Sequence, residues 1–356
     1  MNAPGAAPPR IVIAAGGTAG HVVPAIAVAD ALRAKGAQVT FVGGERAEAE
    51  LVPAAGYPID SMRVEGISRS NPLKAARAVG RAARAVATAR RILADRQADV
   101  VLGGGGYVAG PVGLAAIARR IPLILTEADS HLGLTNRLLA PRARRVCLAF
   151  PIGGRDGSRY ELTGRPVPPL ETDRAGARAQ FGLDVHDTCV LVFGGSLGAR
   201  SINRAAVAAF TGANFRVLHL SGHRDFGELS APGPHYDLRP YFEPFGRALL
   251  AADLVVARAG GSVFEIAAYG LPAVLVPYPH ASADHQTQNA RWMERAGAAI
   301  VFTDSELTPD GLAREVGCLL VDPARMAAMS NASLSIARPD AAAAVAAEVL
   351  AAVRSG

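Results

Sequence analysis

The sequence contains few of the residues that mark a disulfide-rich or metal-binding protein. Its 356 residues include three cysteines, Cys147, Cys189 and Cys318, which lie far apart in mostly apolar surroundings. We therefore expect buried free thiols in a protein of a reducing compartment. No cluster of cysteine and histidine residues has the spacing of a zinc site, so the sequence predicts no bound metal.

Long uncharged segments and interleaved aromatic residues are also missing. No run reaches the roughly 18 apolar residues that span a bilayer, and the longest candidate, residues 341–353, is interrupted by Glu348. Residues 1–9 lack the apolar core of a signal peptide, so we expect a frayed tail. The formal net charge is +6, but no aromatic residue interrupts the basic stretches, which argues against a nucleic-acid partner.

Two glycine-rich stretches stand out against this background, residues 16–21 (G-G-T-A-G-H) and 194–200 (G-G-S-L-G-A-R). Each follows an apolar run and precedes a segment of helical character. Glycine lets backbone approach a ligand closely, and the first-turn N–H groups of the following helix attract anions. The loops therefore favour phosphate or sugar-phosphate binding, the alternative being tight strand-to-helix turns without a ligand. Neither loop fits the G-x-G-x-x-G or P-loop patterns, which argues against an NAD enzyme and a P-loop NTPase.

Apolar strands alternate with helices in both halves of the chain, which predicts an α/β protein of two doubly wound parallel-sheet domains facing each other across a ligand cleft. Pro24 suits the first position of a helix and Gly36 follows its end, so we expect a helix over residues 24–35. The pattern weakens over residues 151–171, which we interpret as the linker. The predicted divisions are an N-terminal domain (1–164), a C-terminal domain (165–338) and a final helical segment (339–356) that packs back toward the N-terminal domain. The expected strands lie at residues 10–15, 38–42, 59–63, 99–103, 122–126, 189–193, 216–220, 236–239, 253–257 and 273–277.

Five motifs occur in order along nearly the whole chain, at residues 16–21, 101–107, 194–200, 258–265 and 284–290. Together they resemble the motifs of the MurG family of peptidoglycan N-acetylglucosaminyltransferases. Each motif alone is weak evidence, whereas five in register are specific.

The resemblance implies the GT-B fold (two Rossmann-like domains), no metal cofactor, and a peripheral enzyme on the cytoplasmic side of the bacterial membrane. Its substrates would be UDP-GlcNAc and lipid I, and GlcNAc would be transferred with inversion to the MurNAc C4 hydroxyl to form lipid II. Other cell-wall synthesis proteins would be further partners. The alternatives are a related GT-B enzyme with another UDP-sugar or acceptor, and a non-catalytic nucleotide-sugar-binding module.

An inverting transferase needs one base to deprotonate the acceptor hydroxyl. His21 lies just before the expected helix, whose positive dipole end disfavours imidazolium and leaves a neutral ring able to accept a proton. It is the leading candidate, and Glu127 and Asp129 are its rivals. A histidine satisfied by its own loop is the structural alternative.

The remaining site residues come from the resemblance. Glu265 matches a glutamate that binds the ribose hydroxyls, Phe242 a position whose backbone contacts uracil, and Gln286 a glutamine that contacts the GlcNAc hydroxyls. Arg165 stands in a linker motif whose usual arginine is replaced by Pro168, and it would supply a substitute cation for the diphosphate. The donor-side set is Thr18, Ala19, Gly20, Asp129, Arg165, Ser196, Phe242, Gly261, Ser262, Val263, Phe264, Glu265 and Gln286. The acceptor-side set is Gly104, Gly105, Tyr107 and Asn136.

Basic residues recur at three- and four-residue steps in the helical stretch 73–94, which places them on one face. They are Lys74, Arg77, Arg81, Arg84 and Arg91. We expect this face to attract anionic lipid, with Ile67 and Leu73 near the acyl region. Ala76, Val79, Ala83 and Val86 would face the core. A simply solvated basic face is the alternative.

Overall fold

The computed structural model describes residues 7–63, 72–195, 197–281 and 284–353, of which residues 72–79 and 81 are described by backbone alone. The chain forms two compact units, Met1–Pro168 with Arg338–Gly356 (unit 1) and Pro169–Ala337 (unit 2). The divisions predicted from the sequence lie at residues 164/165 and 338/339. Each unit is described by itself below.

Unit 1 is built on a parallel sheet of order β3-β2-β1-β4-β5-β6-β7. Buried β-branched and leucine side chains fill its central strands, as expected for a sheet covered on both faces. The strands are β1 (Arg10–Ala14), β2 (Gln38–Gly43), β3 (Ile59–Ser61), β4 (Val100–Gly103), β5 (Leu123–Glu127), β6 (Arg145–Leu148) and β7 (Tyr160–Leu162).

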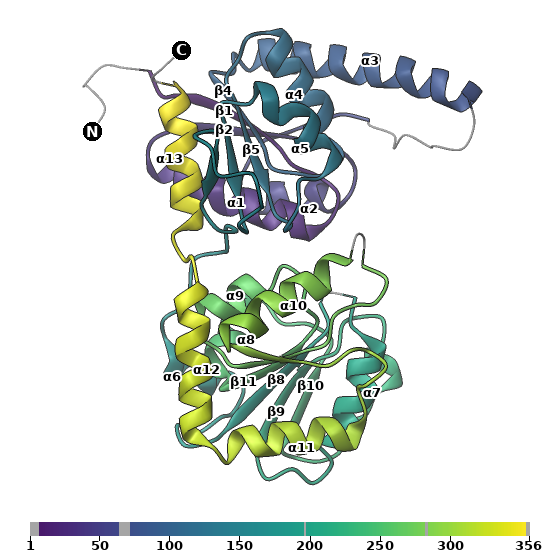
Figure 1. Cartoon of the computed structure of the whole chain (residues 1–356), viewed down its shortest axis with the longest axis vertical. Helices are drawn as coiled ribbons and strands as arrows, with labels where there is room; N and C mark the ends of the chain where they lie inside the picture. The colour runs from purple at the N-terminus through teal and green to yellow at the C-terminus, as the bar shows by residue number, and fades with distance from the viewer. Residues whose placement is uncertain (1–6, 64–71, 196, 282–283, 354–356) are drawn as a thin grey trace. The chain divides into compact units, whose positions relative to one another are not determined.

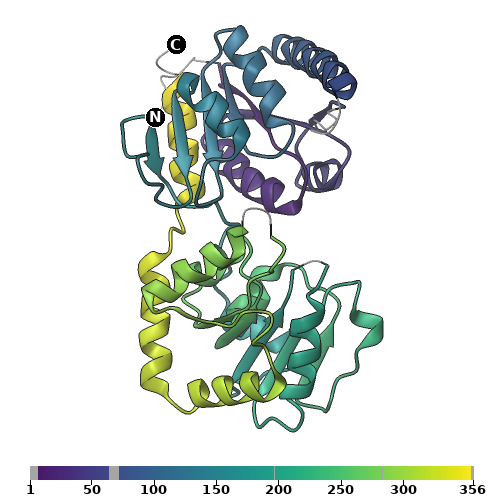
Figure 2. The same ribbon diagram turned by 45° about the vertical axis from the view of Figure 1, so that its right-hand side comes forward.

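Helices cover both faces of this sheet. One apolar cluster joins the sheet to α1 (Ala19–Ala34), α2 (Ala47–Ala54) and the C-terminal α13 (Ala341–Val353). The opposite cluster joins it to α3 (Pro72–Asp95), α4 (Ala109–Ala118) and the short α5 (Leu134–Leu139) with its 3-10 turn η1 (Ala140–Arg142). Figures 1 and 2 show the yellow α13 beside the sheet on the side away from α3 and α4.

Helix α1 begins five residues earlier than predicted. Thr18 occupies its N-cap position, Ala19 is the first helical residue, and Pro24 lies inside the helix. The prediction treated Pro24 as a helix start, but the missing N–H of a proline in the second turn removes only one intrahelical bond, that to the carbonyl of Gly20. His21 therefore lies within the first turn of α1 and not before it.

The stretch interpreted as linker contains β7, which adds to the edge of the sheet beside β6. Both strands are short, and β7 lies among glycine, proline and charged residues, so neither gave a recognisable pattern. The predicted core face of α3 is partly wrong. Ala83 is exposed, and Ala85, Ala89 and Leu93 are buried, with Val86 packed beside them. The side chains of Ala76 and Val79 lie outside the described residues.

Unit 2 has a parallel sheet of order β10-β9-β8-β11-β12-β13. Apolar side chains from α7, α11 and α12 pack on one of its faces. The strands are β8 (Cys189–Phe193), β9 (Arg216–Leu220), β10 (Tyr236–Arg239), β11 (Leu254–Ala257), β12 (Ala273–Leu275) and β13 (Ala299–Val301). The helices are α6 (Arg174–Ala179), α7 (Arg200–Ala209), η2 (Phe226–Glu228), α8 (Phe245–Ala251), α9 (Val263–Ala268), α10 (His285–Ala296), α11 (Pro309–Leu320) and α12 (Pro323–Ile336).

The cysteines are free, as predicted, but their environments differ. Cys147 and Cys189 lie on central strands and are buried, and burial raises the pKa of each thiol to about 12. Cys318 is exposed, because it lies on the solvent side of α11. The expectation of three buried thiols is therefore wrong for Cys318.

Candidate active site

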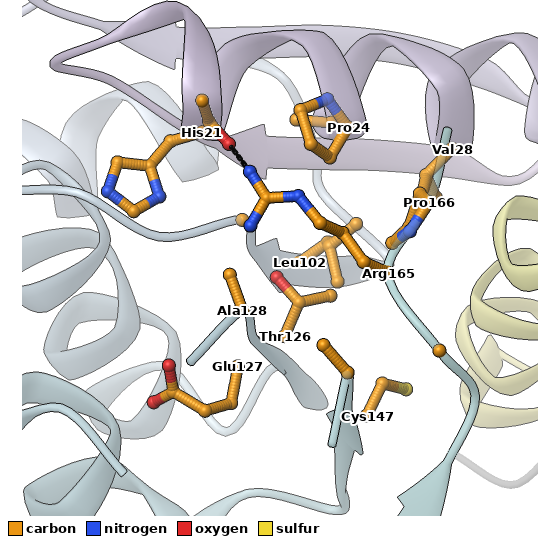
Figure 3. Close-up of a pocket in the computed structure, with 15 residues that line it drawn as sticks. His21, Pro24, Val28, Leu102, Thr126, Glu127, Ala128, Cys147, Arg165 and Pro166 are labelled. Carbon is orange, nitrogen blue, oxygen red and sulfur yellow. Dashed lines mark hydrogen bonds between the residues drawn. The ribbon is translucent and has the colours of Figure 1, made fainter. Parts of the chain in front are cut away.

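Unit 1 contains a pocket at the carboxyl ends of its parallel strands, where the loops after β1, β4 and β5 meet (Figure 3). Its lining is mostly apolar, with His21, Thr126, Glu127 and Arg165 among the polar residues. It is lined by Gly20, His21, Pro24, Ala25, Val28, Leu102, Gly104, Thr126, Glu127, Ala128, Cys147, Ala149, Gly164, Arg165 and Pro166. Ligands of doubly wound folds bind at this edge of the sheet.

His21 lies in the first turn of α1 and lines the pocket. One wall of its ring is the backbone of Gly105, where an added Cβ would come within 2.8 Å of His21 Nδ1. Burial lowers the pKa of His21, the Arg165 guanidinium lowers it further, and the Asp129 carboxylate opposes both. The ring is therefore neutral near pH 7 and able to accept a proton, as a general base requires.

Arg165 reaches α1 from the segment after β7. Its Nη2 donates to the carbonyl oxygen of Gly20, and Figure 3 marks this hydrogen bond with a dashed line from the Arg165 side chain. In a regular helix that carbonyl would accept from the residue four positions later, which is Pro24 and has no N–H. The proline thus leaves an acceptor that holds Arg165 beside His21.

Glu127, the rival base, ends β5 and is 6% exposed. Its carboxylate accepts from Asp129 N (3.2 Å), Gly133 N (2.8 Å) and Asn136 Nδ2 (2.9 Å). The pKa of Glu127 is raised, because burial outweighs the opposing effect of these three hydrogen-bond donors. Because its oxygens order the loop that leads into α5, Glu127 is less available to a substrate than His21. Asn136 also donates to the carbonyl of Thr126 at 2.9 Å, so this predicted acceptor-side residue fixes the same loop.

The loop after β4 brings the predicted acceptor-side residues Gly104, Gly105 and Tyr107 against the loop after β1. Gly104 packs on the Ala15 and Ala25 side chains, with an added Cβ 3.2 and 3.3 Å away. The Tyr107 hydroxyl is turned inward and donates to Glu48 Oε1 at 2.7 Å. Thr18, Ala19 and Gly20 are exposed at the start of α1, where the first amides have no intrahelical acceptor.

The second glycine loop follows β8 in unit 2. Gly195 and Gly198 have φ of +94° and +81°, and Gly198 packs against the backbone of Ser221 and Gly222 after β9. Asn203 of α7 donates to the carbonyl of Ser221 at 2.9 Å and so fastens the two loops. Ser196, the predicted contact, lies outside the described residues.

The other predicted donor residues also follow strands of unit 2. Gly261, Ser262, Val263 and Phe264 form the turn and first residues of α9 after β11, and Glu265 lies in its first turn. Gln286, in the first turn of α10, accepts from Tyr278 N at 3.0 Å, and its Nε2 would lie 3.8 Å from a Cβ at Gly260. Gln286 and the loop after β11 are thus neighbours.

Phe242 follows β10. Its ring packs on Phe181 at 4.6 Å between centroids, and the Arg239 guanidinium lies 5.0 and 5.6 Å from the centroids of Phe181 and Phe242. This stack fixes the backbone at the position expected to contact uracil.

The structure thus gathers the predicted residues into two sets, one within each unit. His21, Glu127, Asp129, Arg165 and the 104–107 loop lie in unit 1. Of the predicted donor-side residues in this unit, Gly20 and Arg165 line the same pocket as His21, whereas Thr18, Ala19 and Asp129 do not line it. The unit 2 set comprises the 194–200 loop, Phe242, residues 261–265 and Gln286.

Sequence reasoning missed several buried polar residues at these edges, notably Glu48, Asn203, His219 and Asn289. The 4% exposed Asn289 donates to Ala259 O at 3.0 Å, and its Oδ1 has no hydrogen-bond partner in the described part of the chain. Polar residues on otherwise apolar helix or strand faces were the available signal. Among the described residues, no three His, Cys, Asp or Glu side chains are grouped as metal ligands.

The sequence matches two domain models of known proteins. The glycosyltransferase family 28 N-terminal domain matches residues 11–148, and the glycosyltransferase family 28 C-terminal domain matches residues 189–345. The crystal structure of MurG from Acinetobacter baumannii superimposes with a TM-score of 0.78 at 30% identity, covering 97% of this chain and 100% of that one. The fold and the matched domains define a glycosyltransferase, and the predicted GT-B fold is confirmed.

Full-length relatives show which family of glycosyltransferases this chain belongs to. The UDP-N-acetylglucosamine–N-acetylmuramyl-(pentapeptide) pyrophosphoryl-undecaprenol N-acetylglucosamine transferase of Methylococcus capsulatus is 43% identical over 347 residues, covering 95% of this chain and 97% of the relative. The enzyme of the same name from Moorella thermoacetica is 40% identical over 370 residues, covering 98% and 100%. The chain belongs to this family, the MurG family, as the sequence motifs predicted.

The charges beside His21 should move its pKa in opposite directions. Arg165→Gln removes a cation that disfavours imidazolium, so the pKa of His21 should rise. Asp129→Asn removes a carboxylate that favours it, so the pKa should fall. The measurement is an NMR titration of the His21 ring in both variants and the parent. Shifts of the same sign in the two variants, or no shift in either, would contradict this electrostatic account.

Proposed function

We propose that this protein transfers N-acetylglucosamine from UDP-GlcNAc to the MurNAc C4 hydroxyl of lipid I, with inversion, to form lipid II for peptidoglycan synthesis. Full-length similarity to enzymes named for this transfer carries the proposal. The pocket of unit 1, where a neutral histidine lies beside a guanidinium, supplies the chemistry that such a transfer needs.

In this mechanism the acceptor hydroxyl gives its proton to His21 as its oxygen attacks the anomeric carbon, and the bond from that carbon to the UDP oxygen breaks. Negative charge accumulates on UDP. In unit 2 the amides of the 194–200 loop and of residues 261–263 would stabilise that charge. In unit 1 the Arg165 guanidinium and the first amides of α1 would likewise stabilise the negative charge of a diphosphate. These groups would do the work of a metal ion, so we propose a metal-independent reaction.

The donor would be held by groups on separate strand ends of unit 2. Glu265 offers two carboxylate oxygens that suit the ribose cis-diol, and the Gln286 amide can donate to and accept from GlcNAc hydroxyls. The backbone at Phe242, fixed by Phe181 and Arg239, would contact uracil. Each of these roles is a proposal from the family resemblance.

A donor and acceptor matrix tests the function. UDP release should be fastest with UDP-GlcNAc and a lipid I analogue, and much slower with UDP-glucose, UDP-galactose or diacylglycerol. It should persist in EDTA. Preference for another sugar or acceptor would indicate a related GT-B enzyme, and binding of UDP-GlcNAc without turnover on any acceptor would indicate a binding module.

His21→Ala should lower kcat by about 10²-fold or more, the usual scale for loss of a general base. The KM for UDP-GlcNAc should change little, since the proposed donor contacts of unit 2 are intact. His186→Ala is the matched control, because His186 is exposed in the loop before β8. An unchanged kcat in His21→Ala together with loss of activity in Glu127→Ala would assign the base to Glu127 instead.

We further propose that the enzyme works on the cytoplasmic face of the membrane and binds it peripherally through the basic face of α3, with other cell-wall synthesis proteins as further partners. Arg84 and Arg91 are exposed on this helix. The side chains of Lys74, Arg77 and Arg81, and all of Ile67, lie outside the described residues. Within the described ranges, no helix combines the length and the apolar character needed to cross a bilayer.

Arg84→Glu with Arg91→Glu should weaken binding to anionic vesicles by roughly tenfold or more, because each basic residue near an anionic surface adds about 1 kcal/mol. High salt should weaken parent binding by screening the same charges. Cosedimentation measures both effects. The control is Arg204→Glu with Arg314→Glu, which makes the same charge change at exposed positions of unit 2. Equal binding of the two double variants would exclude α3 as the contact.

A further inference from the structure

Glu48 is a fully buried carboxylate at the centre of the loops of unit 1. It lies in the first turn of α2 and is 0% exposed. Its Oε2 accepts from Gly17 N at 2.8 Å, and its Oε1 accepts from Gly44 N at 2.8 Å and from the Tyr107 hydroxyl at 2.7 Å. The donors belong to the loops that follow β1, β2 and β4. One side chain therefore joins three strand ends.

The neighbouring glycines leave the space that this carboxylate fills. An added Cβ would lie 2.9 Å from Glu48 Oε1 at Gly16, 2.7 Å from its Cγ at Gly43 and 3.1 Å from Oε1 at Gly44. A side chain at Gly16 or Gly43 would have to displace Glu48, and one at Gly44 would overlap the Tyr107 hydroxyl that donates to it. The glycines in these loops therefore serve the buried carboxylate as well as any ligand outside.

The same loops form the surroundings of His21. Gly106, with φ of +79°, packs so tightly on the carbonyl of Gly16 that a Cβ there would overlap it. Gly105, with φ of +96°, is the wall of the His21 ring. Because Glu48 fixes Gly17 on one side and Tyr107 on the other, it fixes the spacing between α1, which carries His21, and the wall against which the ring packs.

A neutral side chain could not replace this carboxylate. All three partners are donors, and an ionised carboxylate is an acceptor only, whereas glutamine presents an NH₂ group toward one of them. Burial alone would raise the pKa of Glu48, but the Tyr107 hydroxyl and the amides of Gly17 and Gly44 outweigh it and hold the pKa below its usual range. The group is therefore an anion at neutral pH.

We propose that Glu48 is a positioning residue for the transfer reaction, which holds the glycine loops after β1, β2 and β4 so that His21 keeps its orientation toward the acceptor. It touches no substrate and acts through Gly17 and Tyr107. The inference rests on the proposed function, because it requires His21 to be the base.

Glu48→Gln should lower kcat by about tenfold, the scale of one lost charge-assisted hydrogen bond. The KM for UDP-GlcNAc should stay within about twofold, since the proposed contacts to uracil, ribose and GlcNAc lie in unit 2. The acid limb of the pH profile of kcat should move to higher pH. Burial is the main cause of the low pKa of His21, so if the loosened Gly105 wall admits water to the ring, this pKa should rise. The matched control is Glu50→Gln, an exposed glutamate on the same helix, which should leave kcat and the profile unchanged.

A double variant separates this inference from the assignment of the base. If Glu48 acts through His21, then Glu48→Gln should reduce the residual rate of His21→Ala by less than about twofold. A full tenfold loss in that background would overturn the positioning role, as would an unchanged kcat and acid limb in Glu48→Gln itself. The assignment of His21 as the base is tested separately, by the kcat of the His21→Ala single variant.

Tyr107→Phe covers the case in which Glu48→Gln does not fold. It removes one donor and leaves both amide bonds to the carboxylate. The acid limb should move in the same direction by a smaller amount, and kcat should fall by about threefold, because only one of the three hydrogen bonds to Glu48 is lost. A folded Tyr107→Phe enzyme with the parent's kcat and acid limb would overturn the proposal.

Discussion

Glycine loops at strand ends can bring backbone close to a ligand, but their glycines have no side chains with which to hold the shape of the loop. In this protein each loop is fastened from the inside by a buried polar group. In unit 1 a single carboxylate, Glu48, accepts from three donors on three loops. A carboxylate suits this task because backbone amides at strand ends are donors that need acceptors. The outer surface of the loops is thus left for the proposed substrate.

Unit 2 meets the same constraint with a chain of neutral side chains that ends on the Asp225 carboxylate. The Tyr236 hydroxyl lies 2.7 Å from His219 Nδ1, and His219 Nε2 lies 3.0 Å from Asn203 Oδ1. Asn203 then donates to Ser221 O and, at 3.1 Å, to Asp225 Oδ2. Burial lowers the pKa of His219 to about 4, so the ring stays neutral and one nitrogen is left to accept from the tyrosine. The network is fully partnered, which is what makes a buried polar chain stabilising and specific.

The sequence predicted features that depend on residues near one another in the chain, and it missed features that depend on residues far apart in the chain. Strand and helix alternation is a local pattern, so the doubly wound fold and the positions of His21 and residues 261–265 at strand ends were predictable. The start of α1 was not, because Pro24 is a start signal that the surrounding residues override. Glu48 was not, because its role depends on Gly17, Gly44 and Tyr107, which only the folded sheet brings together. The resemblance supplied substrate identity, which no periodicity contains.

The environment of His21 combines two demands that oppose each other. A base must be unprotonated at working pH, and burial and the Arg165 charge ensure this by lowering the pKa of the ring. The same lowering weakens the ring as a proton acceptor, so the shift must be moderate. Asp129 limits it, because its carboxylate acts in the opposite direction. Pro24 makes the arrangement possible, since the carbonyl of Gly20, deprived of its helical donor, binds the guanidinium. A local interruption of the helix thereby sets the electrostatics of the proposed base.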